Sequence, residues 1–221
     1  MLRIALLLLT LAAPAAAQTE PQAWEMRVAG IPIGVATLAL TGGYRIDATA
    51  RTIGAADLVR PYAYAARTTG TARGGRLSPA AYAQTERVRG EESRLALTLG
   101  PAPTVRAKDD PTLPSATLRG ALDPLTALHL VLRDRPTAGA CDLSVRFTDG
   151  VRMGTVALAP TSDPMRCAGT WRRVAGPPPA DARERRRAAA FRLDLAPTPG
   201  GVRVAELSAD APIGRFRLIR R

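Results

Sequence analysis

The sequence predicts a mainly β fold: a curved antiparallel sheet or half-open barrel of about ten strands, with one covering helix and one or two short helices. Three observations predict this fold class. Several short segments alternate apolar and polar residues with a period of two, as strands with one buried face do. Paired glycines and an Asp-Gly step separate these segments. One segment alone has clear helix start and stop signals.

The first half of the chain contains the clearest single strand, Tyr44 to Thr52. Its apolar residues from Tyr44 to Ala50 alternate with arginine, aspartate and threonine, which indicates one buried and one solvated face. Further strands are predicted at 31–40, 62–73, 81–89 and 95–99, a short helix at 54–60, and a proline-rich loop at 101–114.

The predicted covering helix begins after Asp123. Aspartate is a good N-cap, and Pro124 suits the first helical position. Arg133 and Arg135 stand near the expected end, where cations favour the helix dipole, and Pro136 ends the helix. We expect this helix to pack on the sheet through one face, formed by Leu122, Leu125, His129 and Leu132.

The second half of the chain begins with a hairpin around Asp149-Gly150. We predict a three-residue loop, 148–150, because it keeps the apolar residues of both strands on one face. This register pairs Phe147 with Val151, Val145 with Met153, and Leu143 with Thr155. Further strands are predicted at 165–174, 191–195, 202–207 and 213–219, with a polar, partly helical excursion at 180–187.

The first 17 residues predict export. Arg3 is followed by a short apolar run and then by small residues up to Ala17, the order of a cleaved secretory signal peptide. The apolar run is shorter than the roughly 20 residues that span a bilayer. We therefore expect a mature domain, 18–221, in the periplasm, without a later transmembrane segment; the alternative is a retained N-terminal anchor.

The excess of positive charge does not indicate nucleic-acid binding. The chain has 31 Lys+Arg against 19 Asp+Glu, a net charge of +12, but Lys108 is its one lysine and aromatic residues make up 4%. The arginines are spread through the strands, whereas nucleic-acid modules cluster basic and aromatic residues. If the charge is functional, it favours an anionic lipid or polysaccharide of the envelope.

Cys141 and Cys167 are the two cysteines of the chain, and both follow the export signal. An even number of cysteines in an oxidising compartment predicts a disulfide. A bond between the two cysteines would close the loop 141–167 and stabilise the fold by roughly 3–4 kcal/mol. A redox pair would more often have closer spacing, and a metal site would need further ligands.

No pattern in the sequence specifies a catalytic residue, a cofactor site or a metal site. His129 is the single histidine, and its place on the leucine-bearing helix face favours a packing role. There is no GxSxG nucleophile motif and no glycine-rich phosphate loop. Carboxylates that an acid/base pair would draw on are scattered near turns and loops: Glu86, Glu91, Glu92, Asp109 and Asp110.

Several motifs resemble the bacterial family catalogued as domain of unknown function 3108. They are the Tyr44–Ala50 strand, Leu77-Ser-Pro79, the helix start 123–128, Thr148-Asp-Gly150, and the Cys-x-Gly-x-Trp-x-x-Val-x-Gly run at 167–176. The chain departs from the family in its Ala- and Arg-rich composition and in having His129 where an aromatic residue is expected. The resemblance implies an exported β-rich domain of unassigned activity. A looser fold analogy is to lipoprotein-carrier-like half-barrels.

Three functions follow as hypotheses. The first is a non-enzymatic periplasmic protein that binds an apolar or lipid-like ligand on a concave sheet face. The second is a structural or assembly factor that binds an envelope protein or an anionic polysaccharide. The third is a carboxylate-based hydrolase, which needs two carboxylates roughly 5–9 Å apart in a cleft.

Overall fold

The computed structural model describes residues 21–107, 112–177 and 188–221. The signal peptide predicted at 1–17 and the polar excursion predicted at 180–187 lie outside the described residues. Within the described residues, no helix has the length and apolar character needed to span a membrane.

The strands form one antiparallel sheet, which confirms the predicted fold class with more strands than the ten expected. Its thirteen strands are β1 (Gln22–Val28), β2 (Ile31–Thr41), β3 (Arg45–Thr52), β4 (Tyr62–Arg73), β5 (Arg76–Val88), β6 (Glu91–Thr98), β7 (Thr104–Ala107), β8 (Leu143–Thr148), β9 (Met153–Pro160), β10 (Arg166–Ala175), β11 (Ala188–Thr198), β12 (Gly201–Ala211) and β13 (Gly214–Arg220).

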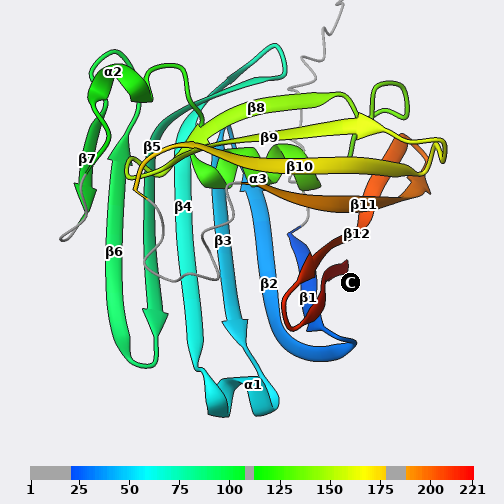
Figure 1. Ribbon diagram of the computed structural model, residues 1–221. Helices are drawn as coiled ribbons and strands as arrows, with labels where there is room; N and C mark the ends of the chain where they lie inside the picture. The colour runs from blue at the N-terminus through cyan, green and yellow to red at the C-terminus, as the bar shows by residue number, and fades with distance from the viewer. Residues whose placement is uncertain (1–20, 108–111, 178–187) are drawn as a thin grey trace, which may run out of the picture.

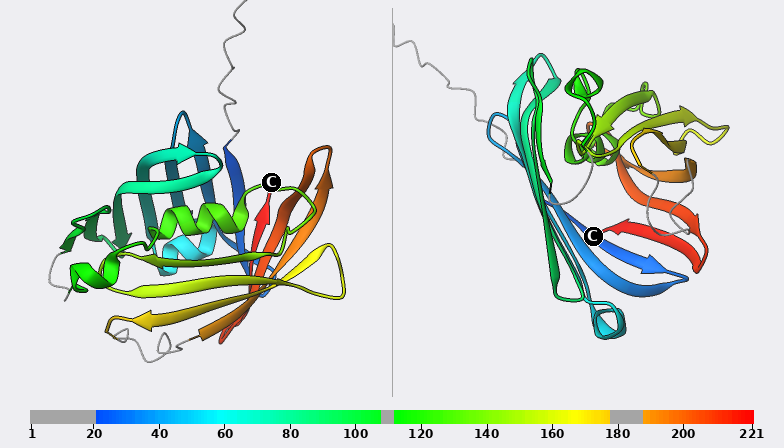
Figure 2. Two further views of the ribbon diagram at one scale, coloured as in Figure 1. Left: turned by 90° about the horizontal axis from the view of Figure 1, so that it is seen from above. Right: turned by 60° about the vertical axis from the view of Figure 1, so that its left-hand side comes forward.

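The sheet consists of two meanders joined at one seam. Strands β1 to β7 form an N-terminal arm and β8 to β13 a C-terminal arm, and β1 pairs with β13 between them. Strands β7 and β8 are the two free edges, so the sheet is not closed. The arms curl toward each other and face one another across a concave inner side (Figures 1 and 2).

In the described part of the chain, three helices accompany the sheet: α1 (Gly54–Val59) between β3 and β4, α2 (Ser115–Leu118), and α3 (Pro124–Leu132). The helix α3 lies between the arms and contacts β3, β4 and β5 on one side and β8 on the other (Figure 2). It is the predicted covering helix, and it begins after Asp123 as predicted.

Two predictions of local structure were wrong. The first is the proline-rich loop at 101–114, which contains the edge strand β7. Prolines flank this strand without interrupting it, so its residues keep the backbone donors that pair with β6. Val105 of β7 also packs against the hydrophobic core.

The second is the register of the β8–β9 hairpin. Thr148 pairs with Met153 and Phe147 with Gly154, so the loop has four residues, 149–152. The Asp149 Oδ1 accepts hydrogen bonds from the backbone N–H groups of residues 151 and 152, at 2.8 and 2.6 Å, and this side chain closes the longer turn. Gly154 leaves space for the Phe147 ring, since a Cβ there would lie 2.8 Å from its Cζ.

Cys141 and Cys167 form the predicted disulfide, with an S–S distance of 1.99 Å and a Cα–Cα distance of 5.3 Å. Cys141 lies just before β8, and Cys167 lies on β10. The bond therefore joins the chain that leaves α3 to the third strand of the C-terminal arm.

Candidate functional site

The concave side of the sheet has two halves, and the upper half is filled. Cross-strand neighbours from β2 to β7 form an upper row, Leu40, Ile46, Thr68, Tyr82, Leu97 and Val105. Ile46 and Thr68 have no exposed surface, and Tyr82 and Leu97 are 2% and 1% exposed. The helix α3 covers this row over β3, β4 and β5, and Gly150 of the β8–β9 turn lies against Val105 at its end.

A buried polar network fixes α3 on the upper row, and Asp123 is its centre. Asp123 has no exposed surface; its Oδ1 accepts the Thr68 hydroxyl at 2.6 Å and the backbone N–H groups of Leu125 and Thr126 at 3.0 Å each. Its Oδ2 accepts the Thr126 hydroxyl. The buried carboxylate is therefore fully engaged in hydrogen bonds, as burial of a charge requires.

Tyr44 extends this network from β3. The Thr126 hydroxyl gives its single hydrogen to Asp123, so the contact between the two hydroxyls is a bond donated by Tyr44. Burial raises the pKa of Tyr44 well above its ordinary value, so this phenol stays protonated and keeps donating. These hydrogen bonds hold α3 in place over the upper half of the concave side.

The lower half of the concave side is less covered. On the same inner side, four residues further along β3 than Ile46, lies a second row, which we call the lower row. It consists of Ala36, Ala50, Tyr64, Glu86 and Ser93. The first four are half-buried and Ser93 is exposed. Alanine side chains fill little of the space above the sheet. The lower row therefore leaves room that larger side chains occupy above the upper row.

The C-terminal arm contributes aromatic side chains to the same side. A row crosses the seam from Val28 through Phe216, Ala209 and Phe191 to Gly169. Both phenylalanines are half-buried. The Phe191 ring lies over Gly169, since a Cβ there would be 2.2 Å from the ring. Glycine at this position therefore lets the ring lie flat on the sheet.

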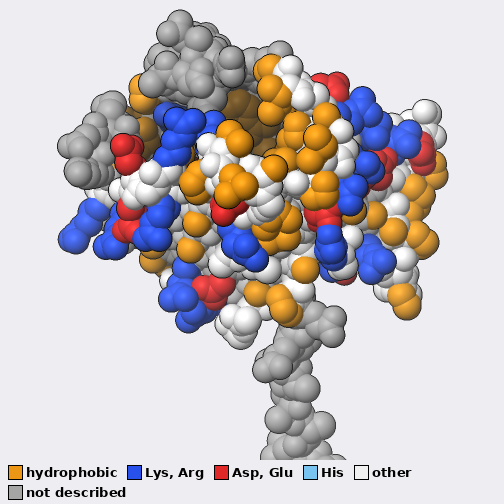
Figure 3. Space-filling model, turned by 90° about the horizontal axis from the view of Figure 1, so that it is seen from below, with side chains coloured by type: hydrophobic (Ala, Val, Ile, Leu, Met, Phe, Trp, Pro, Cys, Tyr) orange, Lys and Arg blue, Asp and Glu red, His pale blue; other side chains and the backbone are white. Residues whose placement is uncertain are grey.

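Figure 3 views the molecule from below and shows a hollow bordered by hydrophobic side chains. The edge of the concave side nearest β7 has a cleft of about 400 Å³, between β5, β6 and the β8–β9 turn. This size lies within the range of small-molecule pockets. Its lining is mixed, with Gln84, Glu86, Leu95, Asp149 and Val151 among the residues.

Polar groups occupy defined places where the two halves meet. The Tyr64 hydroxyl of the lower row contacts the hydroxyl of the upper-row Tyr82 at 3.0 Å, and Tyr82 donates to the Gln84 side chain. Burial, followed by the nearby charge of Glu86, raises the pKa of Tyr62. The wall of β4 and β5 thus offers phenol and carboxylate groups beside apolar surface.

The carboxylates predicted as candidates for acid/base chemistry are mostly engaged locally. Glu92 pairs with Arg87 and Arg94, and these two hydrogen bonds lower its pKa. Asp149 closes its turn. Of the described carboxylates lining the cleft, this leaves Glu86 for the hydrolase hypothesis; Glu91 is exposed in the β5–β6 turn region, and Asp109 and Asp110 lie outside the described residues.

His129 lies inside the molecule on α3, 6% exposed. Burial, with smaller contributions from Arg133 and Arg135, lowers its pKa to about 4, so it is neutral at pH 7. Arg135 closes the end of the same helix by donating to the carbonyls of Val131 and Ala140. Burial lowers the pKa of Arg135 to about 10, which still leaves it charged. These contacts agree with the packing role predicted for His129.

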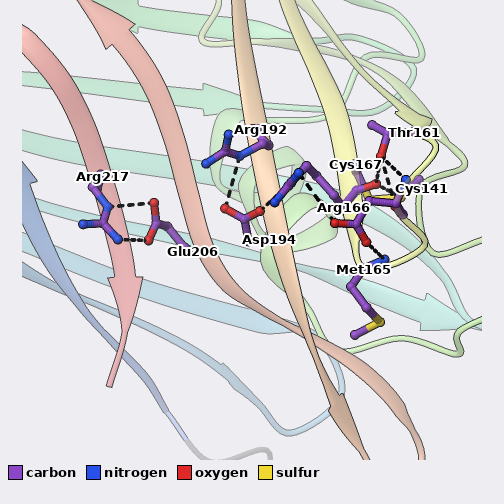
Figure 4. Close-up of polar contacts among 10 residues, drawn as sticks. Cys141, Thr161, Met165, Arg166, Cys167, Arg192, Asp194, Glu206 and Arg217 are labelled. Atoms are coloured by element: carbon purple, nitrogen blue, oxygen red, sulfur yellow. Dashed lines mark hydrogen bonds and ion pairs between the residues drawn. A yellow bond between two sulfur atoms is a disulfide. The ribbon is translucent and has the colours of Figure 1, made fainter.

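The outer face pairs its arginines with shared carboxylates. Asp194 lies between Arg166 and Arg192, at 2.9 and 3.2 Å, and Glu206 pairs with Arg217 (Figure 4). Asp47 is held in the same way by Arg45 and Arg67. Exposed pairs of this kind contribute about 0–1 kcal/mol each, so the arrangement is a solvated sheet face, as the sequence predicts.

The outer face also has a shallow groove over β4 to β7. Its volume is about 370 Å³, its floor is formed by Ala81, Ala83 and Ala96, and Arg67 and Arg106 flank it. Within the described residues, no group of three or more His, Cys, Asp or Glu side chains is placed to hold a metal ion.

Sequence reasoning did not identify the residues of the lower half of the concave side. The alternation around Phe191 and Phe216 predicts that these side chains share a face of the sheet. It does not indicate on which rows of the sheet the covering helix packs. Many strand positions of the sequence are alanine, and this composition fits an uncrowded inner face and a tightly packed one equally well.

Comparison with known proteins supports the fold. No family model matches the sequence, and no curated protein matches it. A solved structure described as a beta-barrel-like protein of domain of unknown function DUF1849, from Brucella abortus, is similar. The TM-score is 0.51 at 13% identity, over 91% of this chain and 95% of that chain. The chain thus has the fold of a β-rich domain of unknown function.

Proposed function

We propose that this chain is a non-enzymatic protein of the bacterial envelope that binds an apolar or lipid-like ligand in the lower half of its concave side. The single observation behind the proposal is the contrast between the two halves. In the upper row Ile46, Thr68, Tyr82 and Leu97 are buried, whereas Ala50, Tyr64, Phe191 and Phe216 on the same side of the sheet are half-buried. Figure 3 shows a hollow bordered by hydrophobic side chains. Exposed apolar concave surface is typical of ligand sites.

Periplasmic localisation is part of the same proposal. It rests on the signal peptide predicted at residues 1–17 and on the disulfide, which suits an oxidising compartment. The finer relationship to domain of unknown function 3108 is also a proposal, supported by the Asp123 helix start and the Asp149-Gly150 turn.

A fluorescent fatty-acid probe tests ligand binding directly. We expect saturable binding to the purified protein, and we expect Ala50→Phe to weaken it at least about tenfold by filling the lower row. Ala65→Phe is the matched control, because Ala65 is exposed on the outer face of the neighbouring strand β4. Equal affinities for the two variants, or no probe uptake by the wild type, would contradict the proposal.

A second candidate function is a structural or assembly factor that binds an anionic polysaccharide. The groove between Arg67 and Arg106 on the outer face favours it, because a shallow, alanine-floored groove with basic sides suits an extended anionic chain. Retention on an anionic polysaccharide column should fall in an Arg67→Gln, Arg106→Gln double variant. The control is Arg73→Gln with Arg76→Gln, which removes the same charge at the β4–β5 turn. Equal retention of both variants would exclude this groove as the site.

A further inference from the structure

Exposed large hydrophobic side chains gather at one edge of the sheet. Of the six found among the described residues, four belong to three adjacent connections: Ile31, Leu58, Val59 and Ile213, which are 65%, 88%, 76% and 71% exposed. Scattered apolar side chains on a surface are ordinary, but a group at one edge indicates an interaction site. We call these four residues the lower-edge patch.

The connections that carry the patch lie side by side. Leu58 and Val59 belong to α1, which joins β3 to β4; Ile31 begins β2, and Ile213 lies in the β12–β13 turn. The strands follow one another in the order β3, β2, β1, β13, β12. Two backbone bonds tie the connections together: Ile53 N–H to the Ile33 carbonyl, and Ala29 N–H to the Arg215 carbonyl, both at 3.0 Å.

The helix α1 displays its hydrophobic residues without packing them. None of its residues is buried, so Leu58 and Val59 make little contribution to the core. Its backbone is nevertheless anchored, because the Thr52 hydroxyl donates to Asp57 at 2.6 Å and accepts the Tyr62 N–H at 2.9 Å. The fold therefore presents two apolar side chains on a fixed support.

Exposed arginines surround the patch. Arg60 follows Val59 directly, and Arg51 lies next to the last residue of β3. Arg89 lies in the adjoining β5–β6 turn, where its N–H bonds to the Pro61 carbonyl. Arg215 flanks the β12–β13 turn. The exposed acids of the same segments are Asp57, which accepts from Thr52, Asp210, which pairs with Arg215, and Glu91.

We propose that the lower-edge patch is a membrane-docking surface that inserts shallowly into a bilayer containing anionic phospholipid. The apolar side chains of the patch suit the boundary of the acyl chains, and the surrounding arginines suit the negatively charged headgroups above it. The hollow of the concave side opens toward the same edge, which Figure 3 shows from outside. The docking proposal stands independently of any ligand in that hollow.

Vesicle co-sedimentation tests the proposal with the mature protein. We expect binding to vesicles of phosphatidylglycerol and phosphatidylcholine, at least about tenfold weaker binding to phosphatidylcholine alone, and a decrease with added salt. Leu58→Asp with Val59→Asp should weaken binding to the mixed vesicles at least tenfold. Leu58→Ala with Val59→Ala should give a smaller loss, which attributes the effect to insertion as well as charge.

The control variant is Thr71→Asp with Ala72→Asp. It adds the same negative charge to exposed positions at the opposite end of β4. We expect its binding to stay within about threefold of wild type, with urea unfolding curves of all variants overlapping. The proposal would be overturned by wild-type protein that ignores anionic vesicles, or by α1 variants that bind as well as the control. Fatty-acid probe uptake by the α1 variants should be unchanged, which separates docking from ligand binding.

Discussion

The two halves of the concave side are built from the same strands, yet one is sealed and the other is open. In the upper half, Asp123 and its partners fix α3 against the sheet, and four of the six upper-row side chains are buried. In the lower half, Ala50 and Tyr64 occupy equivalent inner positions on β3 and β4 and remain half-buried. The difference teaches that the place where one short helix, Pro124–Leu132, crosses β3, β4 and β5 decides which rows of this sheet form a core.

The largest expected effect on stability follows from detaching α3 from the sheet, and Asp123→Ala tests it. It removes the N-cap and leaves the hydroxyls of Thr68 and Thr126 without their acceptor. The expected loss is about 3–5 kcal/mol of unfolding free energy. Urea denaturation measures it, with Glu86→Ala on the lower row as the control, expected to cost less than about 1 kcal/mol. Equal losses for the two variants would mean that the halves do not differ as described.

Removing the Cys141–Cys167 disulfide tests how much the link between the segment after α3 and β10 contributes to stability. The double change to serine should cost roughly 2–4 kcal/mol, because the unfolded chain regains the freedom of the closed loop. Probe binding in the lower half should persist while the protein is folded. Alkylation should find no reactive thiol in native protein before reduction, and two readily labelled thiols would contradict this account.

His129 gives the sealed half a pH dependence. Its pKa is about 4 in the fold and near 6.5 in the unfolded chain, so only the unfolded chain gains a proton between those values. Stability from the neutral histidine is complete above about pH 6.5 and is lost as the pH falls toward 4. The full loss is about 3 kcal/mol.

His129→Gln isolates this contribution, because the carboxylates titrate alike in both proteins. The difference in unfolding free energy between wild type and variant should shift by about 2 kcal/mol between pH 7 and pH 5. A constant difference over that range would show that the histidine is not held neutral by burial.

The sequence predicts the sealed half better than the open one. Helix signals are local, and Asp123, Pro124 and Arg135 lie where the structure uses them. Alternation likewise identifies the strand from Tyr44 to Thr52. The β8–β9 register failed because the Asp149 side chain stabilises a four-residue turn, a competition that hydrophobic pattern alone does not include.

The open half depends on contacts between distant segments. The row from Val28 to Phe191 crosses the β1–β13 seam, which joins the two ends of the described chain. No local pattern specifies that pairing or the rows of the sheet on which α3 packs. Strand β7 escaped prediction for a related reason, since its pairing with β6 is visible only in the fold.

The most direct test of the central claim is native mass spectrometry of the protein purified from its own envelope fraction, beside the Ala50→Phe variant. The account predicts that wild-type protein carries additional mass that is released as an acyl-chain or similarly apolar compound, and that the variant with a filled lower row carries much less. An unliganded mass for wild-type protein, together with no uptake of added fatty acid, would contradict the claim that the lower half of the concave side is a binding site.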